Sequence, residues 1–95
     1  DAFDAQAALA MGLVNWVVGA ERLGAETETI ARRLAQGPTV AYGEIKRLVY
    51  ASADQALAAQ LEAEKEAFAR CAGTRDFAEG VTAFVEKRKP NFKGD

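Results

Sequence analysis

Four basic residues near the end of the chain have the chemistry to bind phosphate groups. Lys87, Arg88, Lys89 and Lys93 place four positive charges within seven residues. Such side chains bind phosphate oxygens through their charge and their N–H donors. The alternative is that these cations are solvated and complement the negative end of a helix. Four charges without groove-binding elements are too few for a nucleic-acid interface, so we expect no nucleic-acid partner.

An aromatic residue precedes this basic cluster at helical spacing. Phe84 lies three residues before Lys87, which predicts that the two side chains share one helix face. An aromatic ring beside an ammonium group can stack on a purine while the cation holds a phosphate. Alternatively, Phe84 packs in the core with Phe77 and Val81, and the spacing leaves both interpretations open.

The composition excludes several other kinds of chemistry. The chain has no histidine, one serine and one cysteine, which excludes histidine-based triads and most sites for first-row metals. Glu62, Glu64 and Glu66 lie two residues apart, so on a helix they do not face one another, and we expect them to be solvated. We therefore expect no catalytic residue and no metal site. A single cysteine, Cys71, forms no internal disulfide, which suits a reducing, cytoplasmic location.

The length and the apolar content indicate a small structure with a thin core. The chain has 95 residues and a mass of 10.2 kDa, which is one domain or part of one. Apolar residues make up 49%, but 21 of them are alanine, which adds little to a core. We expect the chain to depend on neighbouring copies for burial. Since it starts at Asp1 without a methionine, we expect a fragment or a processed product.

Membrane attachment and secretion are not expected. The longest apolar runs are far shorter than the ~18 residues that a membrane span needs. The net charge of −2 gives no general attraction to anionic lipid. The first residues, DAFDAQ, are acidic where a secretory signal would be basic.

The helical signals are spread along most of the chain. They predict helices at about 4–11, 25–36, 38–52, 55–72 and 76–87, separated by glycine and proline at Gly12, Gly37-Pro38 and Gly73. Asp54 is predicted to cap the fourth helix, and Asp76 with Glu79 to form a capping box for the fifth. Residues 13–18 are rich in β-branched side chains, which predicts an extended linker or a lone strand whose partner lies elsewhere. The fold class is therefore all-α, with four to five helices.

Four blocks of this sequence resemble the carboxy-terminal third of the enoyl-CoA hydratase/isomerase (crotonase) family. They are Ala5 and Ala8 with Gly12-Leu13-Val14-Asn15 and Val17-Val18; Leu34-Ala35 with Gly37-Pro38, Ala41 and Lys46; Glu64, Thr74, Asp76, Phe77, Glu79 and Gly80; and residues 83–90 with Phe92. The resemblance covers the entire chain. Each block alone is weakly specific, but their order and separations are those of the family.

The resemblance implies a function for the larger protein. Family members bind acyl-CoA thioesters, and a ββα-superhelix core supplies an oxyanion hole and acidic residues for proton transfer. These groups lie upstream of the matched region, so residues 1–95 would form a helical module without them and be inactive alone. The expected reaction of the larger protein is hydration of a 2-enoyl-CoA, in which water adds to the double bond through an enolate. Double-bond isomerisation is the alternative.

The resemblance also implies roles for particular residues. In the family, an aromatic residue and a lysine of the last helix contact the adenine and phosphate end of CoA, and these positions match Phe84 and Lys87. Coenzyme A would be part of the substrate, and no separate cofactor is implied. The terminal helices of the family build trimers or hexamers, so we expect this chain to form a dimer or trimer. A different alternative is a stand-alone helical module that self-associates without any ligand.

Overall fold

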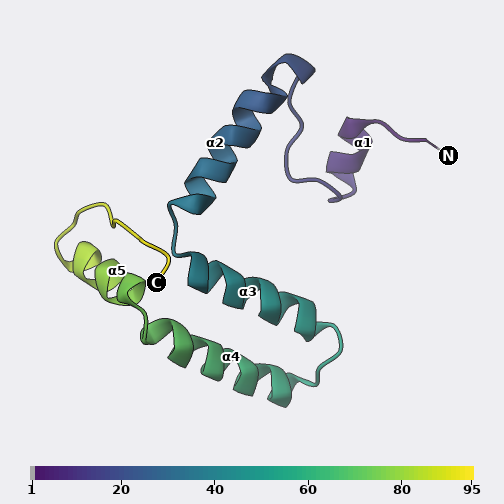
Figure 1. Cartoon of the computed structure of the whole chain (residues 1–95). Helices are drawn as coiled ribbons and strands as arrows, with labels where there is room; N and C mark the ends of the chain where they lie inside the picture. Colours follow the sequence, from purple (N-terminus) through teal and green to yellow (C-terminus); the bar gives the residue numbers. More distant parts are fainter. Residues whose placement is uncertain (1) are drawn as a thin grey trace. The chain divides into compact units, whose positions relative to one another are not determined.

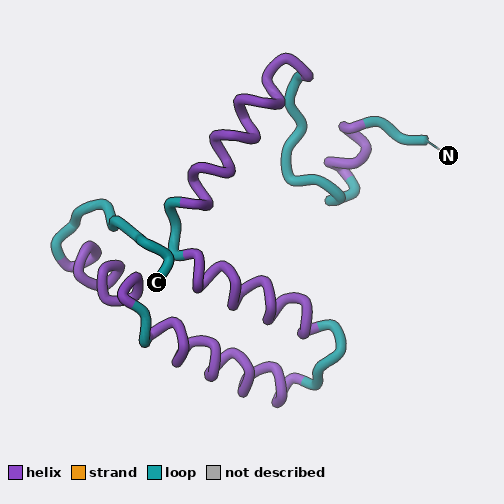
Figure 2. Tube along the Cα trace, in the orientation of Figure 1, coloured by secondary structure: helices purple, strands orange, loops and turns teal. Residues whose placement is uncertain are grey.

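The fold is all-helical, as the sequence predicts. A computed structural model describes residues 2–95, and within that range it contains five α-helices, one short 3-10 helix and no strand (Figure 2). The chain divides into two compact units, residues 1–32 and 33–95. No helix in the described range combines the length and the apolar character that crossing a membrane requires.

The first unit begins with a short helix whose two ends are fixed by local signals. Helix α1 spans Ala5–Ala10, and the side chain of Asp4 accepts a hydrogen bond from the N–H of Ala7 at 2.8 Å. At the other end, Gly12 adopts a φ of +72°, and the N–H of Leu13 donates to the carbonyl of Ala8 at 2.9 Å. This is a Schellman motif with glycine in the left-handed position, so the predicted end of this helix is confirmed.

An irregular segment links α1 to the next helix. Residues 13–18 contain neither helix nor strand within the described chain. The 3-10 helix η1, Ala20–Arg22, leads directly into α2, Leu23–Ala35. Helix α2 thus starts before the predicted position, with Gly24 inside its first turn.

The second unit is built around a pair of consecutive helices. Helix α3, Thr39–Ser52, and helix α4, Leu57–Ala72, lie side by side and are joined by a short turn (Figure 1). Glu44 on α3 joins them, because its carboxylate accepts from Nε of Arg70 at 2.9 Å and from Nη2 of Arg70 at 3.0 Å. The N-cap of α4 is Ala56, without a side-chain hydrogen bond, so the predicted cap at Asp54 is wrong.

The last helix is capped by a residue other than the predicted one. Helix α5 spans Arg75–Val85, and its N-cap is Thr74, whose Oγ1 accepts from the N–H of Phe77 at 3.1 Å. Asp76 and Glu79 therefore do not form the expected capping box. Both carboxylates instead bind backbone N–H groups of residues 88–95, which we call the C-terminal segment and which runs back along α5 (Figure 1).

The core is as thin as the alanine content predicts. The buried apolar residues of the described chain are Ala8, Ala67 and Ala83. Large apolar side chains on α3, α4 and α5 remain exposed, among them Val49, Leu57, Leu61, Phe68, Phe84 and Val85. Burial of large apolar side chains is the main source of folding free energy, and these exposed side chains contribute little of it in the described chain.

Candidate functional site

The predicted site residues Phe84 and Lys87 lie at the carboxyl end of α5. Phe84 is in the last turn of the helix and is 85% exposed. Within residues 2–95, Phe84 therefore does not pack in a core with Phe77 and Val81. The interpretation of Phe84 as a core residue is wrong for this part of the chain. A ring presented to solvent in this way has its face available to a planar ligand.

Lys87 lies beyond the helix rather than on it. Helix α5 ends at Val85, and Lys87 has a φ of 54°, the one positive φ at a non-glycine residue in the described chain. The N–H of Lys87 donates to the carbonyl of Phe84 at 3.2 Å, and the N–H of Arg88 donates to the carbonyl of Ala83 at 3.0 Å. This is the Schellman motif that ends α1, with lysine where α1 has glycine. The expectation that Phe84 and Lys87 share one helix face is therefore wrong.

The left-handed backbone at Lys87 is unfavourable for a residue with a Cβ. The side chain approaches the following carbonyl oxygen, which costs about 1–2 kcal/mol relative to a right-handed conformation. A strained non-glycine residue of this kind often marks a position whose side chain is needed. Lys87 is exposed and belongs to none of the ion pairs found in residues 2–95, so its ammonium group is available to an anion.

The other members of the basic cluster differ from one another. Arg88 is held by two carboxylates: Nη1 and Nη2 donate to Glu79 at 2.6 and 2.9 Å, and Nε donates to Glu86 at 2.6 Å. The bonds to Glu79 and Glu86 raise the pKa of Arg88. The guanidinium of Arg88 and the N–H of Asn91 together lower the pKa of Glu79 to about 2. Arg88 is thus structural. Lys89 and Lys93 are exposed and belong to no ion pair of the described residues.

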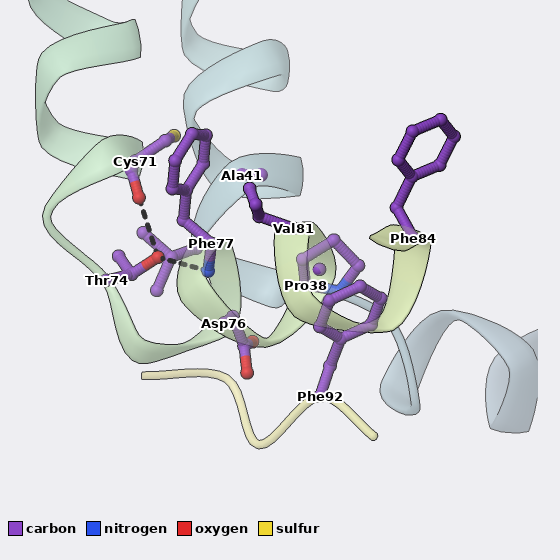
Figure 3. A pocket seen from close by; sticks show the side chains of 11 residues that line it. Pro38, Ala41, Cys71, Thr74, Asp76, Phe77, Val81, Phe84 and Phe92 are labelled. Atoms are coloured by element: carbon purple, nitrogen blue, oxygen red, sulfur yellow. Dashed lines mark hydrogen bonds between the residues drawn. The ribbon is translucent and has the colours of Figure 1, made fainter. Parts of the chain in front are cut away.

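An apolar pocket of about 340 Å³ lies between the three helices of the second unit and the C-terminal segment. Its lining combines aromatic, aliphatic and a few polar side chains: Pro38, Val40, Ala41, Cys71, Thr74, Asp76, Phe77, Gly80, Val81, Phe84 and Phe92. Figure 3 shows Phe84 at the edge of this group, pointing away from the others, whereas Phe92 points from the C-terminal segment toward α5. Phe84 and Phe92 thus both line the pocket, although the Phe84 ring points away from the other lining residues. The sequence motifs did not single out Phe92 as functional.

The remaining sequence-based interpretations concern residues on α4. Glu62, Glu64 and Glu66 are exposed, as predicted, and Glu62 pairs with Lys65 at 2.6 Å. Cys71 is half-buried and lines the pocket. Groups of three or more histidine, cysteine or acidic residues arranged to hold a metal do not occur in residues 2–95.

Comparison with known proteins identifies similarity to one family along the whole chain. The model of the family described as enoyl-CoA hydratase/isomerase matches residues 1–95. The chain is 38% identical to the crotonyl-CoA hydratase of Syntrophomonas wolfei, over 97% of this chain and 35% of that protein. It is 36% identical to the trans-2-decenoyl-acyl-carrier-protein isomerase of Streptococcus mutans, over 99% of this chain and 36% of that protein.

A solved structure has the same backbone arrangement. A protein from Mycobacterium abscessus described as an enoyl-CoA hydratase/isomerase superposes with a TM-score of 0.97 and 39% identity, covering 100% of this chain and 36% of that one. The enoyl-CoA hydratase of Polaromonas sp. JS666 superposes with a TM-score of 0.88 and 31% identity, covering 96% and 35% of the two chains. The chain thus spans about a third of the length of the relatives it matches.

Proposed function

Because the chain belongs to the enoyl-CoA hydratase/isomerase family, we propose that it is the carboxy-terminal helical module of an enzyme acting on acyl-CoA thioesters. The observation that carries the proposal is the family match along residues 1–95. Hydration of a 2-enoyl-CoA is the proposed reaction of the larger protein, in line with the hydratases among the relatives. Isomerisation is the second candidate, since other relatives of similar identity are isomerases.

Within that enzyme, the module would bind the adenine and phosphate end of CoA. Phe84 would stack on the adenine through its exposed face, and Lys87 would bind a phosphate through its ammonium group. The exposure of Phe84 at 85% and the left-handed backbone of Lys87 support this assignment. The proposed roles are binding and orientation of CoA, and we assign no residue of the chain to catalysis.

Titration with coenzyme A tests the binding role. We expect the chain to give a saturable signal with a dissociation constant below about 1 mM, and Phe84→Ala and Lys87→Ala to weaken it. Tyr50→Ala and Lys65→Ala are matched controls, because both residues are exposed, on α3 and α4, and neither lines the pocket, so both variants should leave the affinity unchanged. A wild-type chain that shows no saturation, or an equal loss in the control variants, would contradict the proposal.

The exposed apolar side chains support a second role in assembly. Val49 on α3 and Leu61 on α4 are exposed although they are fully apolar, and association removes such area from water. We expect sedimentation to show a dimer or trimer at micromolar concentration, and Val49→Ser with Leu61→Ser to shift the equilibrium toward monomer. A wild-type monomer that melts cooperatively would contradict the assembly role and leave the binding role standing.

A further inference from the structure

Asp76 is a buried charged residue in the described chain, with 4% of its surface exposed. Its Oδ1 accepts from the N–H of Lys93 at 2.7 Å, and its Oδ2 accepts from the N–H of Gly94 at 2.8 Å. Its own N–H donates to the carbonyl of Asp95 at 2.9 Å. One residue of α5 therefore binds three consecutive residues of the C-terminal segment.

The hydrogen bonds of Asp76 compensate for the burial of its side chain. A buried charge is stable only when it is hydrogen-bonded or paired. No ion pair in residues 2–95 includes Asp76, but two backbone N–H groups and the positive end of α5 supply the compensation. The cap of α5 is already provided by Thr74, so the side chain of Asp76 is not needed for capping. The hydrogen bonds of its side chain attach the C-terminal segment to α5.

Glu79, one turn further along α5, holds the other end of the same segment. Its Oε1 accepts from the N–H of Asn91 at 2.7 Å, and its carboxylate binds the guanidinium of Arg88. The segment is thereby attached to α5 at both ends. Lys87, with its left-handed backbone, lies where the chain turns from α5 into this attached segment.

Phe92 lies between the two attachment points and packs on α5. A Cβ built on Gly80 would lie 3.5 Å from Cε1 of Phe92, which is ordinary contact, so the ring lies directly over Gly80. The same ring lines the apolar pocket together with Phe84. The position of Phe92 in the pocket wall therefore depends on the bonds that Asp76 and Glu79 make.

We propose that Asp76 is a positioning residue for the CoA-binding end of the module. By holding residues 93–95 against the first turn of α5, it keeps Phe92 over Gly80 in the pocket wall and keeps the segment that follows Lys87 attached to α5. The inference rests on the proposed CoA-binding function. In this role Asp76 acts through the C-terminal segment, which its side chain and its N–H bind.

Asp76→Asn is the test variant, because the carboxamide keeps the shape but has one acceptor oxygen instead of two. Glu44→Gln is the matched control, since it also removes the charge of a hydrogen-bonded carboxylate, on α3 and far along the sequence from the C-terminal segment. Phe92→Ala removes the ring without changing the attachment. For each variant, backbone amide exchange at residues 93 and 94, the melting temperature and the dissociation constant for coenzyme A are measured.

We expect Asp76→Asn to accelerate exchange at residues 93 and 94 and to weaken CoA binding. If the segment stays attached in only about a fifth of the molecules, the dissociation constant rises about fivefold. Phe92→Ala should weaken binding as well, whereas Glu44→Gln should leave exchange at these amides and the affinity unchanged, even if its melting temperature falls. This separates positioning from a general loss of stability.

Three results would overturn the inference. The first is unchanged exchange at residues 93 and 94 in Asp76→Asn, and the second is faster exchange with unchanged affinity. If Asp76→Asn does not fold, Phe92→Ala replaces it as the test variant. The third overturning result is then an unchanged affinity for coenzyme A in Phe92→Ala. If the wild-type chain does not bind CoA, the proposed function is refuted and the positioning role fails with it. Titration of the wild-type chain therefore distinguishes failure of the proposed function from failure of the positioning role alone.

Discussion

The rings of Phe68 on α4 and Phe77 on α5 meet edge to face, with their centroids 6.0 Å apart and an interplanar angle of 88°. Edge-to-face pairs contribute about 0.5–1.5 kcal/mol beyond the apolar area they bury. Phe68 is 65% exposed and Phe77 is 40% exposed, so we expect a coupling near the lower end, about 0.5 kcal/mol. Urea unfolding of Phe68→Ala, Phe77→Ala and the double variant measures it. Strictly additive effects would show that the ring pair does not couple the two helices.

Acid should weaken the connection between α3 and α4. Glu44 accepts hydrogen bonds from Arg70 and Arg47, which lower its pKa to about 2. In the unfolded chain the carboxyl has its ordinary pKa of about 4.3, so its contribution to stability is complete above that pH and is lost as the pH falls to about 2. We expect the free energy of unfolding to decrease across this window, and Glu44→Gln to reduce the slope.

Glu79 provides the matched comparison for this pH dependence. Its pKa is also about 2, owing to Arg88 and the N–H of Asn91, but it holds the C-terminal segment rather than α3 and α4. Glu79→Gln should therefore reduce the acid slope as well, and the double variant should reduce it further, because the two sites share no partner. Unfolding curves recorded from pH 2 to 6 measure the slopes. A double variant with the wild-type slope would contradict the assignment of both carboxyls.

Much of the fold was predictable because its signals are local. The end of α1 follows from Gly12, which adopts the left-handed conformation at no steric cost. Gly37 and Pro38 separate α2 from α3 as expected. The thin core agrees with the alanine count, and large apolar side chains such as Leu61 and Phe68 are exposed as well. Each of these features depends on residue type and on neighbours within one or two helical turns.

The features that the sequence did not reveal depend on long-range contacts. Asp76 and Glu79 have the spacing of a capping box, but their partners lie 17 and 12 residues further along the chain, at Lys93 and Asn91. Helix propensity allowed α5 to continue to Lys87, whereas the helix ends at Val85 and the chain then reverses into the attached C-terminal segment. Sequence spacing left the role of Phe84 open and misplaced Lys87 on the helix, and the candidate binding roles of both residues came from the family resemblance.

Replacing Lys87 by glycine should stabilise the chain and weaken ligand binding at once. Glycine adopts a positive φ without steric cost, so Lys87→Gly relieves a backbone strained at a φ of 54° and should raise the free energy of unfolding by up to about 1 kcal/mol. Lys87→Ala keeps the Cβ and should not stabilise. Both variants lack the ammonium group and should bind CoA equally weakly. Greater stability in the alanine variant than in the glycine variant would contradict the strain argument.

The opposite result is expected at Gly94, which lies in the C-terminal segment with a φ of +83°. A Cβ at this position would lie 2.6 Å from Oγ1 of Thr39, which is closer than van der Waals contact. Gly94→Ala therefore combines a clash with an unfavourable backbone, and we expect a loss of about 1–2 kcal/mol. The loss should be accompanied by faster amide exchange at residues 93 and 94.

Two further variants separate the clash from the backbone cost. Thr39→Ala removes Oγ1 and leaves Cβ at 3.9 Å, so the double variant with Gly94→Ala should recover only the part of the loss that the clash causes. Gly43→Ala is the control, because Gly43 lies inside α3 with nothing within 4 Å of a new Cβ. It should stabilise the chain by about 0.5–1 kcal/mol through helix propensity. Urea unfolding followed by helical circular dichroism measures all four variants, and full recovery in the double variant would show that the left-handed backbone of Gly94 carries no cost.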